Sequence, residues 1–176
     1  GRALSAACES LGLRMALMDL AAVVPKMACP AQSVCLPIDA ADGDSVDRAF
    51  GEAAAFLGGI DHLFHVAGFS TIPPRPLRET DPTEWDRVID GNLRSAYLCS
   101  VAALRHMNGD APGIVLVSST MTVAPNRGYG AYIAAKGGTV GLMKALALEN
   151  APRVRVNAVA PSAMLTPFMG GGPQAQ

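Results

Sequence analysis

The sequence predicts an α/β domain built around a parallel sheet. Short apolar runs alternate along the chain with longer segments whose apolar residues recur at helical spacing, and this alternation is typical of βαβ units. Residues 113–118 read Gly-Ile-Val-Leu-Val-Ser, which is typical of a buried strand, whereas residues 44–57 carry an apolar stripe on one helix face. Because 50% of the 176 residues are apolar, the chain can bury a sizeable core, and we expect a single domain over residues 1–176.

The individual elements follow from local patterns. A helical pattern over residues 3–10 ends before Gly12, and Asp81 begins another helix, with proline at the first helical position and Glu84 at the third. Pro37 lies inside an expected strand and indicates an edge position, because proline has no N–H to donate. The expected strands are residues 14–19, 33–39, 60–68, 113–118 and 154–159, and the expected helices are residues 3–10, 44–57, 82–107 and 130–150.

Charge and composition argue against several classes of function. The formal net charge is −1 with both signs interspersed, so the sequence lacks the basic stripe that nucleic-acid binding requires. No apolar run reaches the roughly 20 residues that span a bilayer, and the start lacks a charged segment followed by an apolar signal core. We therefore expect a cytoplasmic protein with neither nucleic acid nor a membrane among its partners.

The cysteines and histidines do not predict a metal site. Cys8, Cys29, Cys35 and Cys99 lack paired Cys-x-x-Cys spacing, and the histidines lie far from them in the sequence. We expect no bound metal, and we expect the cysteines to be reduced thiols in the core or on the surface.

Polar side chains gather directly after the expected strand at residues 113–118. Ser119 follows that strand, and Tyr132 and Lys136 are four residues apart near the start of the next helix. This spacing places the phenol and the ammonium on one helix face, one turn apart. We expect the positive charge to lower the tyrosine pKa from its usual value of ~10 toward neutrality. Ligands bind at the carboxyl ends of strands in open α/β sheets, so the sequence predicts an active site at this edge.

A serine that ends a strand, followed by Tyr-x-x-x-Lys on the next helix, resembles the short-chain dehydrogenase/reductase family. The interval from Ser119 to Tyr132 matches the family's usual spacing, and the resemblance runs from Gly1 to about Met169. It implies a Rossmann-like, doubly wound parallel sheet in three αβα layers. It also implies reversible hydride transfer between NAD and an alcohol or carbonyl substrate.

The resemblance implies a role for each of four catalytic residues. Ser119 holds the substrate oxygen, and Tyr132 exchanges its proton with the substrate. Lys136 depresses the tyrosine pKa and holds the nicotinamide ribose. Asn92 orders a relay water within a local distortion of its helix, although a buried and purely structural asparagine is the alternative.

The resemblance also implies a set of cofactor-binding residues. Gly1 matches the last glycine of the phosphate loop, and Asp19 lies where a carboxylate accepts hydrogen bonds from the adenosine ribose. A carboxylate there repels a 2′-phosphate, so NAD is favoured over NADP. Asp39 matches the position beside the adenine ring, but it is equally a solvated strand end. The full set is Gly1, Asp19, Asp39, Ala67, Gly68, Tyr132, Lys136, Pro161, Met164 and Thr166.

The sequence departs from the family pattern at three places. His65-Val66 stands where the family has Asn-Asn, and we interpret His65 as a satisfied strand-end histidine in preference to an acid–base group. Ser162 and Met164 replace a glycine and a valine of the family's Pro-Gly-x-Val-x-Thr. The family's first strand and its C-terminal part are lacking, so we expect either a gap in the sheet between the strands that end at Asp19 and Gly68 or these two strands drawn together to fill it.

Two other functions stay open, together with the state of assembly. The first is a non-catalytic dinucleotide-binding or association module, and the second is an NADP-dependent 3-oxoacyl-thioester or carbonyl reductase, which Asp19 disfavours. The resemblance also implies a homo-oligomer, a dimer or a tetramer, that forms through the helices of Asn92 and Tyr132. Small residues expected on the outer faces of these helices are Ala96, Ala103, Ala134, Gly138 and Gly141.

Overall fold

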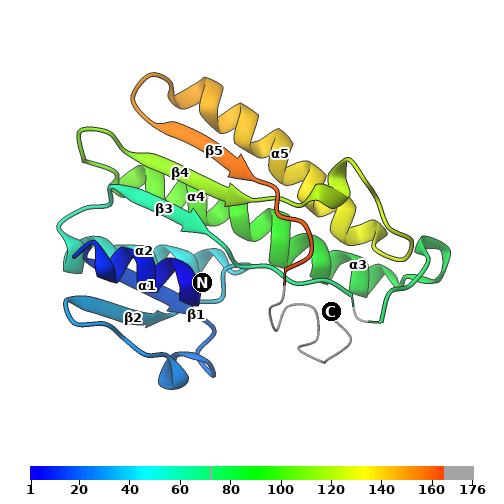
Figure 1. The fold of residues 1–176 in the computed structure, drawn as a ribbon, viewed down its shortest axis with the longest axis horizontal. Helices are drawn as coiled ribbons and strands as arrows, with labels where there is room; N and C mark the ends of the chain where they lie inside the picture. Colours follow the sequence, from blue (N-terminus) through cyan, green and yellow to red (C-terminus); the bar gives the residue numbers. More distant parts are fainter. Residues whose placement is uncertain (72, 165–176) are drawn as a thin grey trace.

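The structure is a computed structural model that describes residues 1–71 and 73–164. Parallel strands alternate with helices along the chain (Figure 1). The strands are β1 (Met15–Asp19), β2 (Ser33–Pro37), β3 (His62–His65), β4 (Gly113–Val117) and β5 (Arg155–Val159). The helices are α1 (Arg2–Ser10), α2 (Gly43–Leu57), α3 (Pro82–Ile89), α4 (Ser95–His106) and α5 (Gly130–Asn150). This is the Rossmann-like αβα arrangement expected from the sequence.

The strands form two separate parallel sheets within the described residues. One sheet pairs β1 with β2, and the other has the order β3-β4-β5. The gap expected between the strands that lead to Asp19 and Gly68 is therefore confirmed. Among the residues that the structure describes, strand β2 pairs with β1 alone, with Pro37 opposite Asp19 in register, which confirms the edge position expected from the proline.

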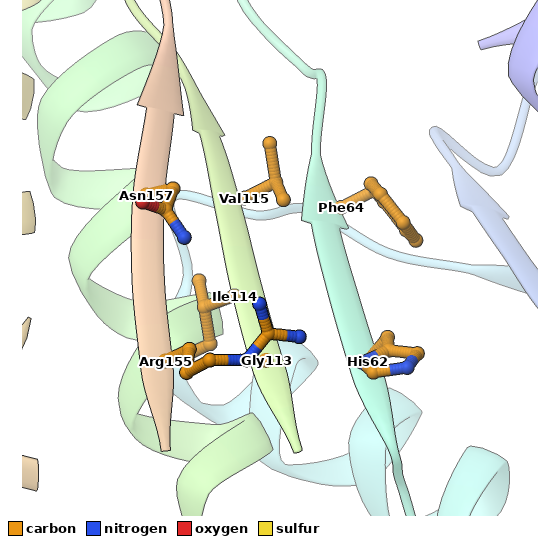
Figure 2. A pocket seen from close by; sticks show the side chains of 7 residues that line it. All are labelled: His62, Phe64, Gly113, Ile114, Val115, Arg155 and Asn157. Carbon is orange, nitrogen blue, oxygen red and sulfur yellow. The ribbon is translucent and has the colours of Figure 1, made fainter. Parts of the chain in front are cut away.

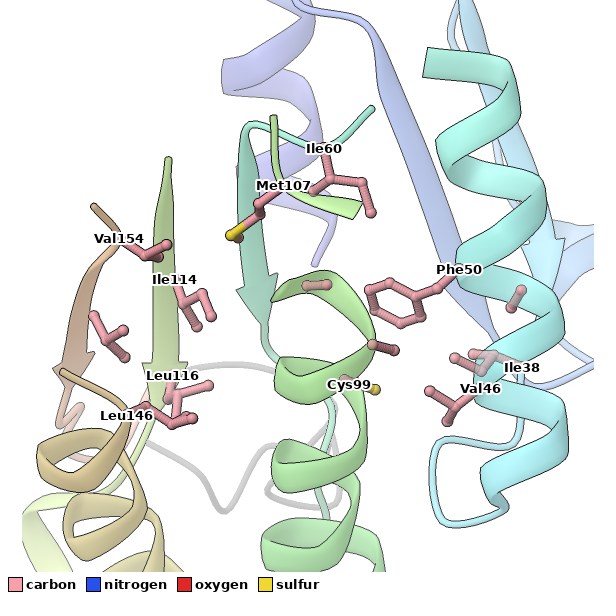
Figure 3. Close-up of a cluster of buried hydrophobic side chains, with 14 residues drawn as sticks. Ile38, Val46, Phe50, Ile60, Cys99, Met107, Ile114, Leu116, Leu146 and Val154 are labelled. Atoms are coloured by element: carbon pink, nitrogen blue, oxygen red, sulfur yellow. The ribbon is translucent and has the colours of Figure 1, made fainter. Parts of the chain in front are cut away.

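Helices α2, α4 and α5 bury one face of the strands. Alternate residues of β4, Ile114 and Leu116, are completely buried against these helices, together with Val46 and Phe50 of α2 (Figure 3). The other face of β3, β4 and β5 is open, because Phe64 is 44% exposed. A shallow hollow lies on this open face of β3, β4 and β5, and the helices lie on the far side of the strands (Figure 2). It is lined by His62, Phe64, Gly113, Ile114, Val115, Arg155 and Asn157.

The helix expected over residues 82–107 contains a local distortion. Helix α3 passes into a π-helical turn, Asp90–Arg94, before α4 begins. The Nδ2 group of Asn92 donates to the carbonyl of Val88 at 2.8 Å. That carbonyl is the one that the Asn92 backbone N–H would use in a regular α-helix, so the side chain replaces a helical bond where the backbone widens.

Two strands end earlier than expected. Strand β2 ends at Pro37 and β3 ends at His65, whereas the sequence placed their ends at residues 39 and 68. The residues after His65, which the sequence placed in the strand over residues 60–68, leave the sheet where Gly68 lies against Asn92. A Cβ on Gly68 would fall 2.5 Å from Asn92 Oδ1, which only glycine avoids.

Cys29 and Cys35 form a disulfide, so the expectation of four reduced cysteines is wrong for this pair. The segment after β1 folds back onto β2 and brings the two Cα atoms to 5.9 Å, within the usual range for a disulfide. Nothing in the spacing of the two residues signals this return of the chain. Cys8 and Cys99 are free thiols, and burial raises the pKa of Cys99 to about 12.

Candidate active site

Four buried side chains meet where β4 ends and α5 begins. Ser119, Tyr132, Lys136 and Asn92 are 7%, 8%, 3% and 1% exposed. They come from the turn after β4, from α5 and from the π-helical turn, and Figure 1 shows these three elements side by side. These are the four residues to which the sequence analysis assigned catalytic roles.

Lys136 ties the start of α5 to the end of β4. Its Nζ donates a hydrogen bond to the carbonyl of Val117 at 2.8 Å, and its own carbonyl accepts one from Ser118 Oγ at 3.0 Å. Burial lowers the lysine pKa to about 8. Because that value is still above neutrality, the ammonium form predominates at pH 7.

Tyr132 does not have the lowered pKa expected from its spacing to Lys136. Burial, which disfavours the phenolate, raises the tyrosine pKa, and a hydrogen bond with the Ser119 hydroxyl opposes this effect. The ammonium of Lys136 lies over the aromatic ring, 5.6 Å from its centre. Helical spacing therefore brought the two side chains together as expected, but the sequence could not indicate how strongly the phenol is desolvated.

Ser119 is held in place by its own turn. It precedes a 3-10 turn, Thr120–Thr122, and its Oγ accepts a hydrogen bond from the backbone N–H of Met121 at 3.2 Å. Strand β4 is regular and buries its alternate residues. The end of this strand therefore fixes where the Ser119 hydroxyl lies. Such placement at the carboxyl end of a central strand is where α/β sheets bind ligands.

Asn92 is fixed through its amide nitrogen and leaves its oxygen available. Nδ2 donates to the carbonyls of Val88 and Phe69, each at 2.8 Å, whereas the buried Oδ1 has no partner among the described residues. A Cβ on Gly68 would fall 2.5 Å from this oxygen and 3.2 Å from Lys136 Nζ. The two polar atoms are therefore close neighbours, and the glycine lets the backbone pass beside them.

Apart from Tyr132 and Lys136 of α5, the described residues expected to contact a cofactor end or follow a strand, or precede α1. Asp19 is exposed, and its Oδ1 accepts from the N–H of Leu20 at 2.8 Å. Asp39 is exposed, and its Oδ1 accepts from the N–H of Ala41 at 3.0 Å. Gly1 is exposed at the N-cap of α1.

The remaining members of this set lie on the side of the four buried residues. Ala67 is exposed and Gly68 half-buried directly after β3. Pro161 accepts a hydrogen bond at its carbonyl from the N–H of Thr120 at 3.0 Å, which joins the segment after β5 to the turn after Ser119. Met164 is 55% exposed, and Thr166 lies outside the described residues.

Sequence reasoning missed several residues that shape the site. His65 is not the satisfied histidine that we expected, because its Nε2 is buried with no partner among the described residues. The ring of Phe69 occupies the space where a side chain on Gly91 would lie, with Phe69 Cε1 2.2 Å from the position of a Cβ. Ser118, which donates to the Lys136 carbonyl, was expected only as the last residue of its strand.

Two further features are absent from residues 1–71 and 73–164. This part of the chain contains no cluster of three His, Cys, Asp or Glu side chains that could hold a metal ion. No helix in it combines the length and apolar character needed to cross a bilayer.

The fold and the site together define a Rossmann-like αβα domain with a polar cluster at the carboxyl ends of its strands. The profile of a family described as enoyl-(acyl carrier protein) reductase matches residues 1–176. The chain belongs to the short-chain dehydrogenase/reductase family.

Individual relatives agree with this membership. The cis-4-hydroxycyclohexanecarboxylate dehydrogenase of Sinomonas cyclohexanicum is 40% identical over 77% of this chain, which spans 55% of that relative's length. The structure of the Thermoplasma acidophilum aldohexose dehydrogenase superposes with a TM-score of 0.88 at 28% identity, covering 99% of this chain and 69% of that one. A 3-ketoacyl-(acyl-carrier-protein) reductase from Brucella melitensis, complexed with NADH, gives 0.83 at 28% identity, with 91% and 69% covered.

Proposed function

We propose that this chain carries the proton-transfer and cofactor-binding groups of an oxidoreductase that moves a hydride reversibly between NAD and an alcohol or carbonyl substrate. The observation that supports the proposal is the buried cluster of Ser119, Tyr132, Lys136 and Asn92. A surface tyrosine and lysine at helical spacing would stay solvated, whereas these two groups are desolvated beside a serine hydroxyl.

The chain's own residues divide the work in this proposal. The hydroxyls of Ser119 and Tyr132, which already bond each other, bind the substrate oxygen between them. In the reduction direction the neutral Tyr132 phenol gives its proton to the carbonyl oxygen, and in the oxidation direction the Tyr132 phenolate takes the proton of the substrate hydroxyl. Lys136 supplies a fixed positive charge that favours the phenolate at that moment.

The residues present fit a nicotinamide dinucleotide. Gly68 lets the backbone pass close to Lys136 Nζ and Asn92 Oδ1, because a Cβ there would fall 2.5 Å from Asn92 Oδ1, a buried oxygen that has no donor among the described residues. Gly68, Tyr132, Lys136 and the segment that begins at Pro161 would hold the nicotinamide half, and Gly1, Asp19 and Asp39 the adenosine half. When bound, the cofactor supplies or accepts the hydride.

NAD is expected to bind better than NADP because of Asp19. Its carboxylate is exposed at the end of β1, and its repulsion of a 2′-phosphate, screened by solvent, is expected to favour NAD by about tenfold or more. Asp19→Ala should reduce this preference, and Asp110→Ala, in a loop at the opposite ends of the strands, should leave it unchanged. Titrations with both cofactors measure the ratio. Equal affinity for both in the unaltered protein would remove Asp19 from the ribose site.

A 3-oxoacyl-thioester reductase is the second candidate. The family description and the Brucella melitensis relative both name acyl-carrier-protein substrates. Such an enzyme uses the same proton and hydride steps, so the two candidates differ in the substrate and in the preferred cofactor. Turnover of a 3-oxoacyl thioester, compared with that of simple secondary alcohols, separates them.

We also propose that the protein forms a homo-oligomer through α4 and α5, although on fewer small residues than the sequence suggested. Ala96 and Ala103 are completely buried within the chain and cannot contribute. Ala134 is exposed, and a Cβ on Gly141 would meet open space. Gly141→Arg is therefore expected to lower the mass measured by light scattering to that of a monomer, whereas Gly51→Arg on α2 should not. A monomeric mass for the unaltered protein would contradict the proposal.

A further inference from the structure

We propose that His65 is a positioning residue of the candidate active site, and that its unprotonated Nε2 accepts a hydrogen bond from the Lys136 ammonium through one bound water. The proposal deepens the proposed function and rests on it for the kinetic consequence. In this arrangement His65 keeps the ammonium solvated inside the protein, and so sets the charge that acts on Tyr132.

The register of the sheet places His65 on the face of the sheet that the helices cover, beside the part of β4 to which Lys136 is bonded. His65 is paired with Leu116 in the adjacent strand, and paired residues of parallel strands, about 4.8 Å apart, point to the same side. Leu116 is completely buried beneath the helices, and His65 is 6% exposed. The next residue of β4, Val117, is the one whose carbonyl accepts from Lys136 Nζ at 2.8 Å.

The polar atoms around this point need one more partner. His65 Nε2 and Asn92 Oδ1 are buried without a donor among the described residues. Lys136 Nζ lies beside Asn92 Oδ1, next to Gly68. An ammonium has three N–H donors, and the hydrogen bond to Val117 uses one of them. A buried water typically joins two to four polar partners, and a water between these three groups gives each acceptor a donor.

The protonation state of His65 suits an acceptor. Burial, followed by the charge of Lys136, lowers the histidine pKa to about 4, against a smaller effect of a hydrogen bond with its own backbone. The imidazole is therefore neutral at pH 7. Since its other nitrogen engages the backbone, the lone pair is at Nε2.

Within residues 1–71 and 73–164, no other buried charge faces His65 from the elements packed around it. Strand β4 has no titratable side chain, and the buried titratable groups of α4 and α5 are Cys99, Tyr132 and Lys136. The raised pKa values of Cys99 and Tyr132 keep both neutral. The other charged or titratable side chains of α4, α5 and the π-helical turn are exposed or half-buried: Asp90, Arg94, Tyr97, Arg105, His106, Lys144 and Glu149.

The direct test is the pKa of Lys136, measured by NMR titration of the lysine side chain. His65→Leu removes the acceptor, which disfavours the ammonium, and is expected to lower the lysine pKa by roughly one unit or more. His65→Gln, which offers an amide at the position of Nε2, should return the lysine pKa most of the way to its value in the unaltered protein. His62→Gln, on the open face of the same strand, is the matched control. An unchanged lysine pKa in His65→Leu, or no recovery in His65→Gln, overturns the proposal.

The kinetic readout separates this proposal from the function on which it rests. The alkaline limb of the kcat profile is expected to move to lower pH in His65→Leu, with KM unchanged. If Tyr132→Phe loses turnover and the His65 variants change nothing, the proposed oxidoreductase function stands and the positioning role of His65 fails. If His65→Leu shifts the lysine pKa in a protein that shows no turnover, the contact between His65 and Lys136 stands and the proposed function fails.

A measurement on the unaltered protein covers the case in which His65→Leu does not fold. The ¹⁵N resonances of His65 are expected to show an unprotonated Nε2 at neutral pH and a titration near pH 4. A proton on Nε2, or a titration near the ordinary value of ~6.5, would overturn the proposal.

Discussion

Tyr132→Phe is expected to reduce turnover by about 10²- to 10⁴-fold, which is the usual contribution of a general acid–base group, while NAD binding is retained. The substitution removes the hydroxyl that we propose exchanges a proton with the substrate, and it keeps the ring beneath the Lys136 ammonium. The fold should survive, because the loss is one hydrogen bond with Ser119, worth about 1 kcal/mol.

Steady-state kinetics and a cofactor titration of the same preparation measure the two effects separately. Tyr129→Phe is the matched control, since this tyrosine is the N-cap of the same helix but has Ile133, and no lysine, four residues on. A near-normal rate in Tyr132→Phe, or an equal loss in Tyr129→Phe, would show that another group carries the proton.

The sequence predicted best the elements whose signals are local. Helix α5 begins at Gly130 and ends at Asn150 as expected, because a run of small residues and its boundaries lie within the segment itself. The site residues at its start were found for the same reason. A spacing of four residues fixes the relation of Tyr132 and Lys136 on a helix, whatever surrounds them.

The features that the sequence could not predict depend on contacts between distant segments. The helix distortion at Asn92 was expected from the family resemblance alone, and the hydrogen bond from Asn92 to Phe69, 23 residues away, is not indicated by any periodicity within the helix. The direction of the Tyr132 pKa depends on how much of the molecule covers the phenol. The Cys29–Cys35 disulfide requires the chain to turn back onto β2, which the spacing alone does not specify.

Lys136 should make the protein less stable at neutral pH, because its charge is buried. Its pKa is about 8 in the folded chain against an ordinary 10.5, and a difference of this size corresponds to about 3 kcal/mol. Between these two values the unfolded chain binds a proton that the folded chain does not, so the free energy of unfolding rises with pH across this window. The cost of the charge is fully present below pH 8 and is absent above about 10.5.

Lys136→Met is therefore expected to raise the free energy of unfolding at pH 7 by about 1–3 kcal/mol and to abolish turnover. Methionine matches the length of the lysine stem without a charge. It leaves the Val117 carbonyl without the donor that it has at 2.8 Å, which offsets about 1 kcal/mol of the gain. Urea unfolding at pH 7 and near pH 10.5 measures the effect, and the advantage of the variant should vanish at the higher pH. Lys144→Met, exposed on the same helix, should change neither property.

A loss of stability at pH 7 in Lys136→Met would indicate that this lysine is retained to hold α5 against β4. A gain in stability with loss of turnover is the result expected of a group kept for its chemistry.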